Sequence, residues 1–335
     1  MSMNNLNDNS QKLLITGGAG YIGSHTTHFL IANGYKARDV IVFDNLVYGH
    51  REFLSNDVIF IHGDLLNKTE IESVFKEYNI DAVLHFAAYA YVGESMQDPG
   101  KYFENNIVGG LNLLGEMAKY ECKKIVFSSS CAVYGIPERI PVKEVEKENP
   151  VSPYGESKLM FEKILGWYEK IYNINYVSLR YFNAAGADFG IGEDHNPETH
   201  LIPLAIFAAL GIREKIKIFG DDYNTPDGTC IRDYIHVTDL ADAHLKAMEY
   251  LKKYKRSDVF NLGSHNGTSV RDIIGMVKHI TGRDFTVEEA EKRDGDPPVL
   301  LAYNEKAKGV LCWEPQKNLG EIIQSAWAWH KSQHQ

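Results

Sequence analysis

Cysteine is scarce in this sequence, with four residues among 335 and no CxxC pair among them: Cys122, Cys131, Cys230 and Cys312. That scarcity argues against a fold stapled by disulfides and favours reduced thiols in a cytoplasmic protein. Long apolar runs are absent as well, so we expect no membrane-spanning helix. The polar, asparagine-rich start lacks the apolar stretch of a signal peptide, and we interpret residues 1–11 as a frayed tail.

Positive charge is also in short supply, because 35 Lys and Arg face 45 Asp and Glu and leave a net charge of −10. This balance argues against a nucleic-acid-binding surface. It does not argue against a small anionic ligand, since helix N-termini and single arginines can bind one. Typical zinc spacing is missing too, so we expect no metal site at His25, His28, His195 and His200.

What the sequence does contain is a glycine turn between a strand pattern and a helix pattern. The run LLITGGAGYIGSH at 13–25 has the GxxGxxG spacing. Gly17 permits a tight turn, Gly20 lets the backbone approach a pyrophosphate, and Gly23 allows the helix to pack closely on the strand. The helix N-terminus then offers unpaired N–H groups to the phosphates. The run therefore predicts a dinucleotide site rather than a purely structural turn.

The first half of the chain alternates short apolar runs with helical patterns. This order predicts an α/β fold with a doubly wound parallel sheet of the Rossmann type. The expected strands are residues 12–15, 40–43, 58–62, 82–86, 124–128 and 176–179. The expected helices are residues 21–33, 68–78, 99–120 and 154–172.

Past about residue 183 the loops lengthen and become richer in Gly, Asp, Asn and Pro. We therefore expect an NAD-binding Rossmann domain over residues 12–182 and a smaller mixed α/β lobe for substrate over residues 183–335. Helices are expected in this lobe near 237–251, 269–281 and 319–331. A strand at 259–262 is expected to return to the main sheet.

Two aspartates that follow strand patterns bear on the choice of cofactor. Asp44 ends the run VIVFD, 21 residues after Gly23. A carboxylate there accepts hydrogen bonds from the adenosine ribose and repels a 2′-phosphate, which favours NAD over NADP. The plain alternative is a carboxylate that caps a turn. Asp64 follows the third strand pattern, where it either accepts from the adenine amino group or caps the next helix.

A YxxxK pattern supplies the candidate for hydride-transfer chemistry. Tyr154 and Lys158 lie at i and i+4 of an expected helix, so their side chains share a face. A nearby ammonium and a positive nicotinamide ring lower the pKa of a phenol, so that Tyr154 can accept a hydroxyl proton. Ser130 closes the SSS run and can bridge substrate and phenol. The plain alternative is a surface pair, and the second YxxxK, from Tyr120 to Lys124, is a decoy that runs from a helix end into a strand.

Longer motifs carry a resemblance to a known family: GGAGYIGSH at 17–25, FAA at 86–88, VGES at 92–95, SSS…VYG at 128–135, YGESK at 154–158, RYFNAAGA at 180–187 and RDYIHVTDLADAH at 232–244. From about residue 12 to residue 330 the chain resembles the UDP-galactose 4-epimerases, a family of extended short-chain dehydrogenases/reductases. The resemblance implies a retained NAD, which takes hydride from C4 while Tyr154 removes the proton of the 4-hydroxyl. The 4-keto sugar then turns and receives hydride on its other face, while UDP stays anchored.

The same resemblance implies which residues form the site. Catalysis falls to Tyr154, Lys158 and Ser130. NAD is expected to contact Gly17, Gly20, Tyr21, Ile22, Gly23, Asp44, Asn45, Asp64, Leu65, Phe86, Ala87, Ala88, Asn105, Ser128, Tyr154, Lys158 and Tyr181. The UDP-sugar is expected to contact Ser130, Tyr154, Asn183, His200, Leu201, Phe219, Arg232, Arg293, Asp296 and Leu300. Within this second set the arginines pair with the diphosphate, the aspartate with the uridine ribose, and the phenylalanine with the uracil.

The chain departs from the family pattern at a few positions. Many members have Lys where this chain has Ala90, a hydroxyl residue where it has Ala132, and Asn where it has His200. The first change removes an expected cofactor contact, and the second leaves Ser130 as the main hydroxyl. Leu300 stands where a bulky Tyr goes with plain hexoses, so UDP-N-acetylhexosamines are a second hypothesised class of substrate.

Two other functions stay open. A nucleotide-sugar 4,6-dehydratase on this scaffold carries an Asp-Glu pair after the strand-end hydroxyl residue, where this chain reads Ser130-Cys131-Ala132. A non-catalytic NAD-sensing protein often loses the Tyr and Lys pair that this chain keeps. The family also forms homodimers through the helices around 99–120 and 154–172, and the resemblance implies a homodimer here.

Overall fold

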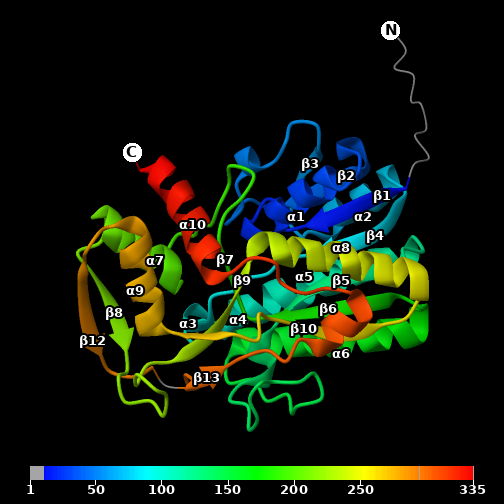
Figure 1. The fold of residues 1–335 in the computed structure, drawn as a ribbon. Coiled ribbons are helices and arrows are strands. Elements are labelled where there is room, and N and C mark those ends of the chain that lie inside the picture. The colour runs from blue at the N-terminus through cyan, green and yellow to red at the C-terminus, as the bar shows by residue number, and fades with distance from the viewer. Residues whose placement is uncertain (1–10, 294, 335) are drawn as a thin grey trace.

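The computed structural model describes residues 11–293 and 295–334. The tail expected over residues 1–11 lies outside the described residues except at position 11. Figure 1 shows a large sheet flanked by helices and, beside it, a smaller lobe built from the second half of the chain.

The large sheet has seven strands, and every neighbouring pair is parallel. Its order is β10-β6-β5-β4-β1-β2-β3, which reverses direction between β1 and β4. The strands are β1 (Lys12–Thr16), β2 (Val40–Asp44), β3 (Ile59–His62), β4 (Ile80–His85), β5 (Lys124–Ser130), β6 (Asn175–Tyr181) and β10 (Asp258–Leu262). This is the doubly wound α/β fold that the sequence predicts, and its reversal point is where such folds bind ligands.

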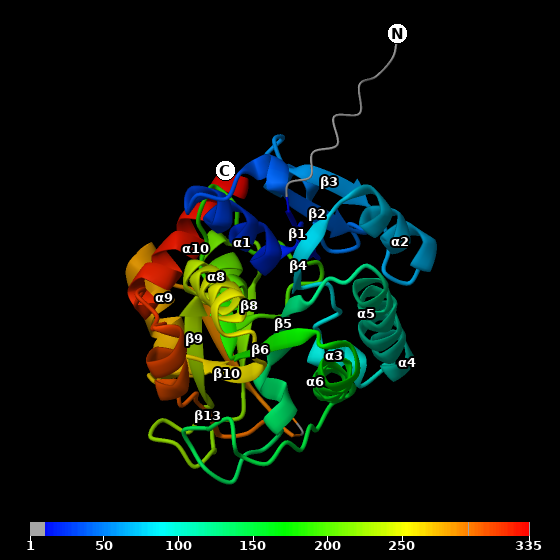
Figure 2. The same ribbon diagram turned by 90° about the vertical axis from the view of Figure 1, so that its right-hand side faces the viewer.

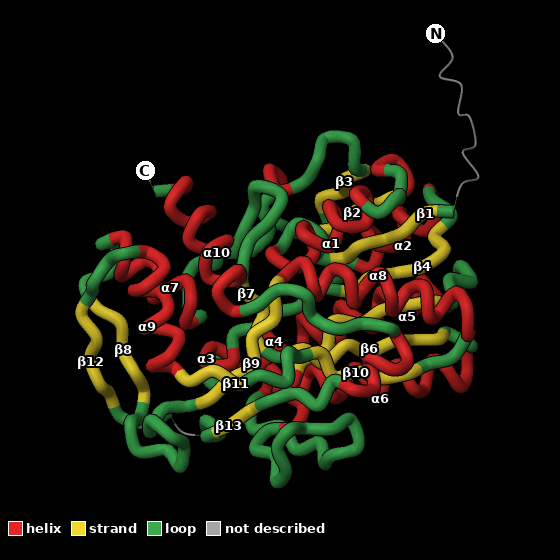
Figure 3. Tube along the Cα trace, viewed as in Figure 1, coloured by secondary structure: helices red, strands yellow, loops and turns green. Residues whose placement is uncertain are grey.

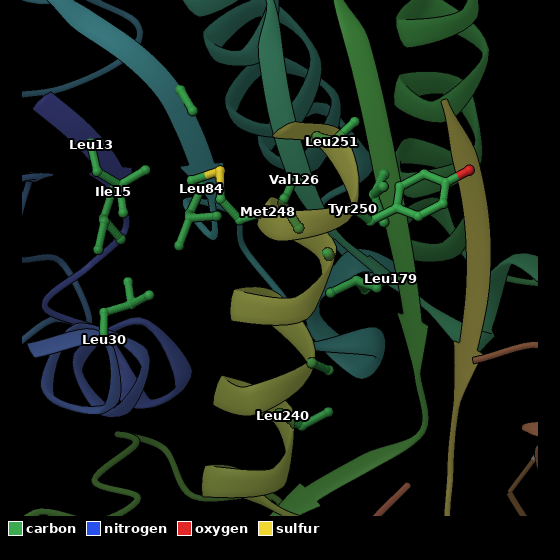
Figure 4. Packing of buried hydrophobic residues seen from close by; sticks show 14 of the residues in the cluster. Leu13, Ile15, Leu30, Leu84, Val126, Leu179, Leu240, Met248, Tyr250 and Leu251 are labelled. Atoms are coloured by element: carbon green, nitrogen blue, oxygen red, sulfur yellow. The ribbon is translucent and has the colours of Figure 1, made fainter. Parts of the chain in front are cut away.

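Helices cover both faces of the sheet, which explains why its inner strands place apolar residues on both faces. Leu13 and Ile15 belong to one core cluster and Leu14 to another, as period-two alternation requires. Helices α1 (Tyr21–Ala32) and α8 (Val237–Tyr254) cover the first face, and α2 (Lys68–Glu77), α5 (Gly109–Lys119) and α6 (Pro153–Tyr172) cover the second, as Figure 2 shows. Figure 4 shows the α8 residues Leu240, Met248 and Leu251 beside Val126 and Leu179 of the sheet.

Local signals in the sequence place several helix starts. The Asn67 side chain caps α2, and the Ser152 side chain caps α6, where Pro153 occupies the first turn. The helix expected over 99–120 is interrupted, because a π-helical segment separates α4 (Pro99–Phe103) from α5. The shorter segments are α3 (Val92–Ser95), three 3-10 turns (Ala37–Asp39, Arg51–Phe53, Cys131–Tyr134) and two π-helical turns (Glu104–Val108, Ala307–Leu311).

The smaller lobe is mixed α/β. Strand β9 (Ile231–His236) pairs with β7 (Asn183–Ala185), β11 (Gly267–Ser269) and β13 (Val299–Leu300), while β8 (Lys215–Phe219) pairs with β12 (Thr286–Ala290). Its helices are α7 (Leu201–Leu210), α9 (Val270–Thr281) and α10 (Leu319–Gln333), which share one core cluster. Figure 3 shows the long loops that join these elements. Within the described ranges we find no helix whose length and apolar character would let it span a bilayer.

Candidate active site

One cavity of about 440 Å³ lies at the carboxyl ends of the large sheet and extends to the smaller lobe. Its wall includes residues that directly follow or end β1, β2, β3, β4, β5 and β6, so it lies at the reversal point of the sheet. Of the residues expected to hold NAD, all but Ser128 line it: Gly17, Gly20, Tyr21, Ile22, Gly23, Asp44, Asn45, Asp64, Leu65, Phe86, Ala87, Ala88, Asn105, Tyr154, Lys158 and Tyr181.

The glycine turn is tight enough to require glycine. Gly17 has φ +71°, and a Cβ there would lie 2.4 Å from the amide nitrogen of Ala87. A Cβ on Gly23 would lie 2.3 Å from the carbonyl oxygen of Gly17. Gly20 caps α1 without a side chain, so no capping side chain occupies the N–H groups of its first turn. The turn is therefore a cradle in which backbone can approach a pyrophosphate closely.

The two aspartates have different surroundings. The Asp44 carboxylate accepts from the backbone N–H groups of Ala19 (2.9 Å) and Leu46 (2.8 Å), which ties it to the glycine loop. Burial raises the pKa of Asp44, and these two hydrogen bonds oppose that shift. The Asp64 carboxylate accepts from the Asn45 amide at 2.9 Å. Asp64 does not cap α2, because Asn67 holds that position, so the helix-cap interpretation was wrong.

Ser130, Tyr154 and Lys158 meet on the wall of the same cavity. Ser130 ends β5, and its hydroxyl oxygen accepts from the N–H of Ala132 at 3.1 Å. Tyr154 and Lys158 lie in the first turns of α6, and the Lys158 ammonium is 5.9 Å from the centre of the Tyr154 ring. That ammonium donates to the carbonyl oxygen of Ser128 at 2.8 Å, which fixes its position.

The protonation of this trio differs from the simplest expectation. Burial raises the pKa of Tyr154, and a hydrogen bond from Ser130 only partly offsets that effect. Burial also lowers the pKa of Lys158 to about 7. Without the positive nicotinamide ring, the described residues therefore do not produce the lowered phenol pKa that the sequence suggested, because desolvation of the buried phenol dominates.

The residues expected to bind the UDP-sugar divide into two groups. Ser130, Tyr154, Asn183, His200, Asp296 and Leu300 line the cavity, whereas Leu201, Phe219, Arg232 and Arg293 are not part of its wall. Arg232 donates to Asp296 at 2.8 Å, and the Arg293 guanidinium lies 3.9 Å from the centre of the Phe219 ring. Each arginine expected to bind the diphosphate thus contacts a residue expected to bind the uridine, Asp296 for Arg232 and Phe219 for Arg293. Ser128, which was expected to contact NAD, is buried, and its Oγ lies 3.1 Å from Nε2 of His244.

Sequence reasoning missed part of the wall. Glu193 and His195 line the cavity next to His200, and Tyr91 lines it beside them. Ring contacts link Tyr91 and His200 to His195, at centroid distances of 5.7 and 5.3 Å. The glutamate, which lies in an irregular loop between β7 and α7, shows no periodic signal that could have placed it here. By contrast, His25 and His28 bond to backbone carbonyls in or near α1.

Comparison with known proteins identifies similar sequences over nearly the whole chain. A model of the NAD dependent epimerase/dehydratase family matches residues 13–263. The UDP-glucose 4-epimerase of Streptococcus mutans is 52% identical over 324 residues, which cover 96% of this chain and 97% of that protein.

Solved structures agree in fold over nearly the whole chain. A UDP-glucose-4-epimerase from Stenotrophomonas maltophila, with bound NAD and formylated UDP-arabinopyranose, superposes with a TM-score of 0.92 at 36% identity and covers 97% of this chain and 99% of its own. The UDP-Glc/GlcNAc 4-epimerase of Campylobacter jejuni superposes with a TM-score of 0.85 at 41% identity, over 96% of this chain and 100% of its own.

Proposed function

Because the chain belongs to the NAD-dependent epimerase/dehydratase family, we propose that it interconverts UDP-galactose and UDP-glucose by inverting C4 of the hexose. The observation that carries this proposal is the meeting of Ser130, Tyr154 and Lys158 on the wall of a cavity that also contains the glycine turn. That arrangement puts a proton acceptor for a sugar hydroxyl beside a dinucleotide cradle.

NAD is the cofactor that the cradle fits. Gly17 and Gly23 let the turn pack against Ala87 and let α1 pack against the turn, where a Cβ would collide with backbone. Asp44 lines the cavity where an adenosine ribose is expected. A carboxylate at that position disfavours the 2′-phosphate of NADP. When bound, NAD supplies the hydride acceptor and donor for C4 of the sugar.

The chain's own groups handle the proton and the position of the substrate. In this proposal the Tyr154 oxygen takes the proton of the 4-hydroxyl and returns a proton to O4 after the hexose has turned. Ser130 donates to the phenol or to O4, and Lys158 adds positive charge that favours the phenolate. Arg232 and Arg293 hold the diphosphate after leaving their present partners, so binding energy on UDP keeps the reacting sugar in the cavity.

Dehydration across C5–C6 is less well supported. That reaction needs further acid and base groups beside the strand-end hydroxyl. Here Ser130 is followed by the turn Cys131–Tyr134, which contains no carboxylate. The retention of Tyr154 and Lys158 also argues against a non-catalytic NAD-sensing protein.

N-acetylated sugars are a second substrate class with an observation in favour. Leu300 lines the cavity, and its side chain is shorter than the Tyr found with plain hexoses. A relative that is 41% identical is named for both Glc and GlcNAc. We therefore propose that UDP-N-acetylglucosamine is also accepted, with Leu300→Tyr expected to reduce its turnover far more than that of UDP-glucose.

We further propose a homodimer in the cytoplasm. Helices α5 and α6 carry exposed apolar residues of the kind that a four-helix interface would bury. Free thiols suit a reducing compartment, and the described chain holds four of them: Cys122, Cys131, Cys230 and Cys312.

The test is to incubate purified protein with UDP-galactose, without added NAD, and to separate the nucleotide sugars. UDP-glucose is the expected product, and UDP-N-acetylglucosamine is the next substrate to try. A 4-keto-6-deoxy sugar would replace the proposal with a dehydratase. No conversion even after NAD is added would overturn it.

A further inference from the structure

Four side chains from the loop that leads into α7 gather beside the cavity, and three of them form part of its wall. We call Glu193, His195, Glu198 and His200 the His–Glu cluster. Each contributes one nitrogen or carboxylate oxygen, and these four atoms all lie within 4.8 Å of one another. Glu193, His195 and His200 line the cavity, so the cluster borders the space proposed for substrate.

Two atoms of the cluster each lie close to two others, and hydrogen bonds alone cannot satisfy all of these contacts. Oε1 of Glu193 lies 3.0 Å from Nδ1 of His195 and 2.6 Å from Nδ1 of His200. The same Nδ1 of His200 lies 2.9 Å from Oε1 of Glu198. One imidazole nitrogen carries at most one proton, so it cannot donate fully to two carboxylates. Oε1 of Glu198 also accepts from the backbone N–H groups of Thr199 and His200, at 2.7 and 2.8 Å. A single cation between the four side chains would remove the competition for Nδ1 of His200.

Two buried oxygens at the cluster also lack partners. Oε2 of Glu198 is buried without a hydrogen-bond partner among the described residues, and the side chain of Glu198 is only 5% exposed. The Tyr91 hydroxyl is likewise buried and unpartnered, and its ring packs on His195. A buried carboxylate oxygen without a partner is costly, so it indicates a group that the chain alone does not supply.

The donor set identifies that group. Two carboxylates carry a charge of −2, which one divalent cation balances when both imidazoles are neutral. Imidazole nitrogen suits zinc and its neighbours in the first transition row, while carboxylate oxygen completes a four-coordinate shell. Ligand atoms of tetrahedral zinc lie roughly 3.3 Å apart, so the cluster needs only small side-chain shifts to close on a metal.

We propose that the His–Glu cluster is a divalent transition-metal site of the zinc class, which fastens the β7–α7 loop to the start of α7. The metal also neutralises the carboxylate of Glu193 on the wall of the cavity and that of Glu198 behind it. If the proposed function holds, this neutralisation favours an anionic UDP-sugar there. The metal itself takes no part in the hydride or proton transfer.

The test measures metal binding in full-length protein, without any sugar. Purified protein is dialysed against Zn²⁺ and its metal content is measured, and Co²⁺ is then added to read the visible absorption of a four-coordinate site. We expect one equivalent of metal for each chain and a tetrahedral Co²⁺ spectrum. His200→Ala and the isosteric Glu198→Gln should each weaken binding at least about tenfold.

A histidine outside the cluster provides the matched control. His279→Ala, on an exposed position of α9, should bind metal as the wild type does. Circular dichroism of each variant checks that the chain still folds. Wild-type protein that retains no metal, or cluster variants that retain as much as His279→Ala, would overturn the proposal and leave the cluster a network of ion pairs. Because no sugar is present, neither result depends on the epimerase assay.

Discussion

The pKa of the Tyr154 phenol is raised by burial, and a hydrogen bond from Ser130 opposes that rise. We expect Tyr154→Phe to reduce epimerase turnover by about 10²–10⁴-fold, because the variant loses the group that exchanges a proton with the sugar. Affinity for UDP, measured by calorimetry, should stay near the wild-type value. Tyr120→Phe is the control, since it removes the phenol of the other YxxxK pattern, outside the cavity wall. Full activity in Tyr154→Phe would refute the assigned role.

Lys158 predicts a pH dependence of stability. Burial lowers its pKa to about 7, whereas the value in an unfolded chain is near 10.4. Between these values the unfolded state binds more protons, so the contribution of Lys158 to the free energy of unfolding rises with pH. We expect this rise to be ~2 kcal/mol between pH 7 and pH 9 in protein freed of nucleotide.

Urea unfolding at the two pH values measures this effect. The variant Lys158→Met keeps the apolar stem and removes the titrating group, so its unfolding free energy should lack the increment. The same increment in both proteins would show that burial does not depress the pKa of Lys158.

At the scale of elements, the first turn of α1 depends on its close approach to β1. We expect Gly23→Ala to weaken NAD binding severely, because the added Cβ would lie 2.3 Å from the Gly17 carbonyl oxygen and would push the helix away from the turn. Gly275→Ala in α9 is the matched control, since nothing lies within 4 Å of its Cβ. That change should stabilise the protein by ~0.5–1 kcal/mol. Cofactor content after purification and thermal unfolding distinguish the two, and equal NAD content would contradict the prediction.

Some helices and strands can be predicted from the sequence and others cannot. The strands of the large sheet were predictable because each contains a short apolar run that loop or helix signals separate from the next run. Helix α7 was not, because LIPLAIFAAL is apolar all round and shows no amphipathic stripe. Strands β8 and β12 pair across about seventy residues, and the β12 sequence TVEEA is mostly polar. Such a pairing depends on tertiary contacts that no local pattern records.

The candidate site shows the same division. The glycine turn and the pair Tyr154 and Lys158 occupy regular elements, so spacing predicts which way they face. The four residues of the His–Glu cluster lie in an irregular loop, where spacing predicts no direction. Their convergence appears only once β7 and α7 fix the two ends of that loop.

At the scale of the whole molecule, α6 presents an unpaired apolar face. Trp167 and Ile171 are 61% and 63% exposed, and they lie four residues apart on one side of the helix. We expect a homodimer in light scattering, and we expect the double variant Trp167→Asp, Ile171→Asp to be a monomer. The control Val145→Asp alters an exposed apolar residue in a loop and should leave the dimer intact. A dimer that survives the double variant would exclude this face.

The seventh strand of the large sheet limits where the chain can be truncated to give an isolated cofactor-binding domain. Strand β10 arrives some eighty residues after β6 and pairs along its whole length, from Asp258 with Val177 to Leu262 with Tyr181. A fragment that stops near residue 182 would leave β6 with a bare edge, ready to recruit a strand from a neighbouring molecule. Because β10 from the second half of the chain completes the sheet of the first half, the smallest fragment that keeps the cofactor site without a bare strand edge is nearly the entire chain.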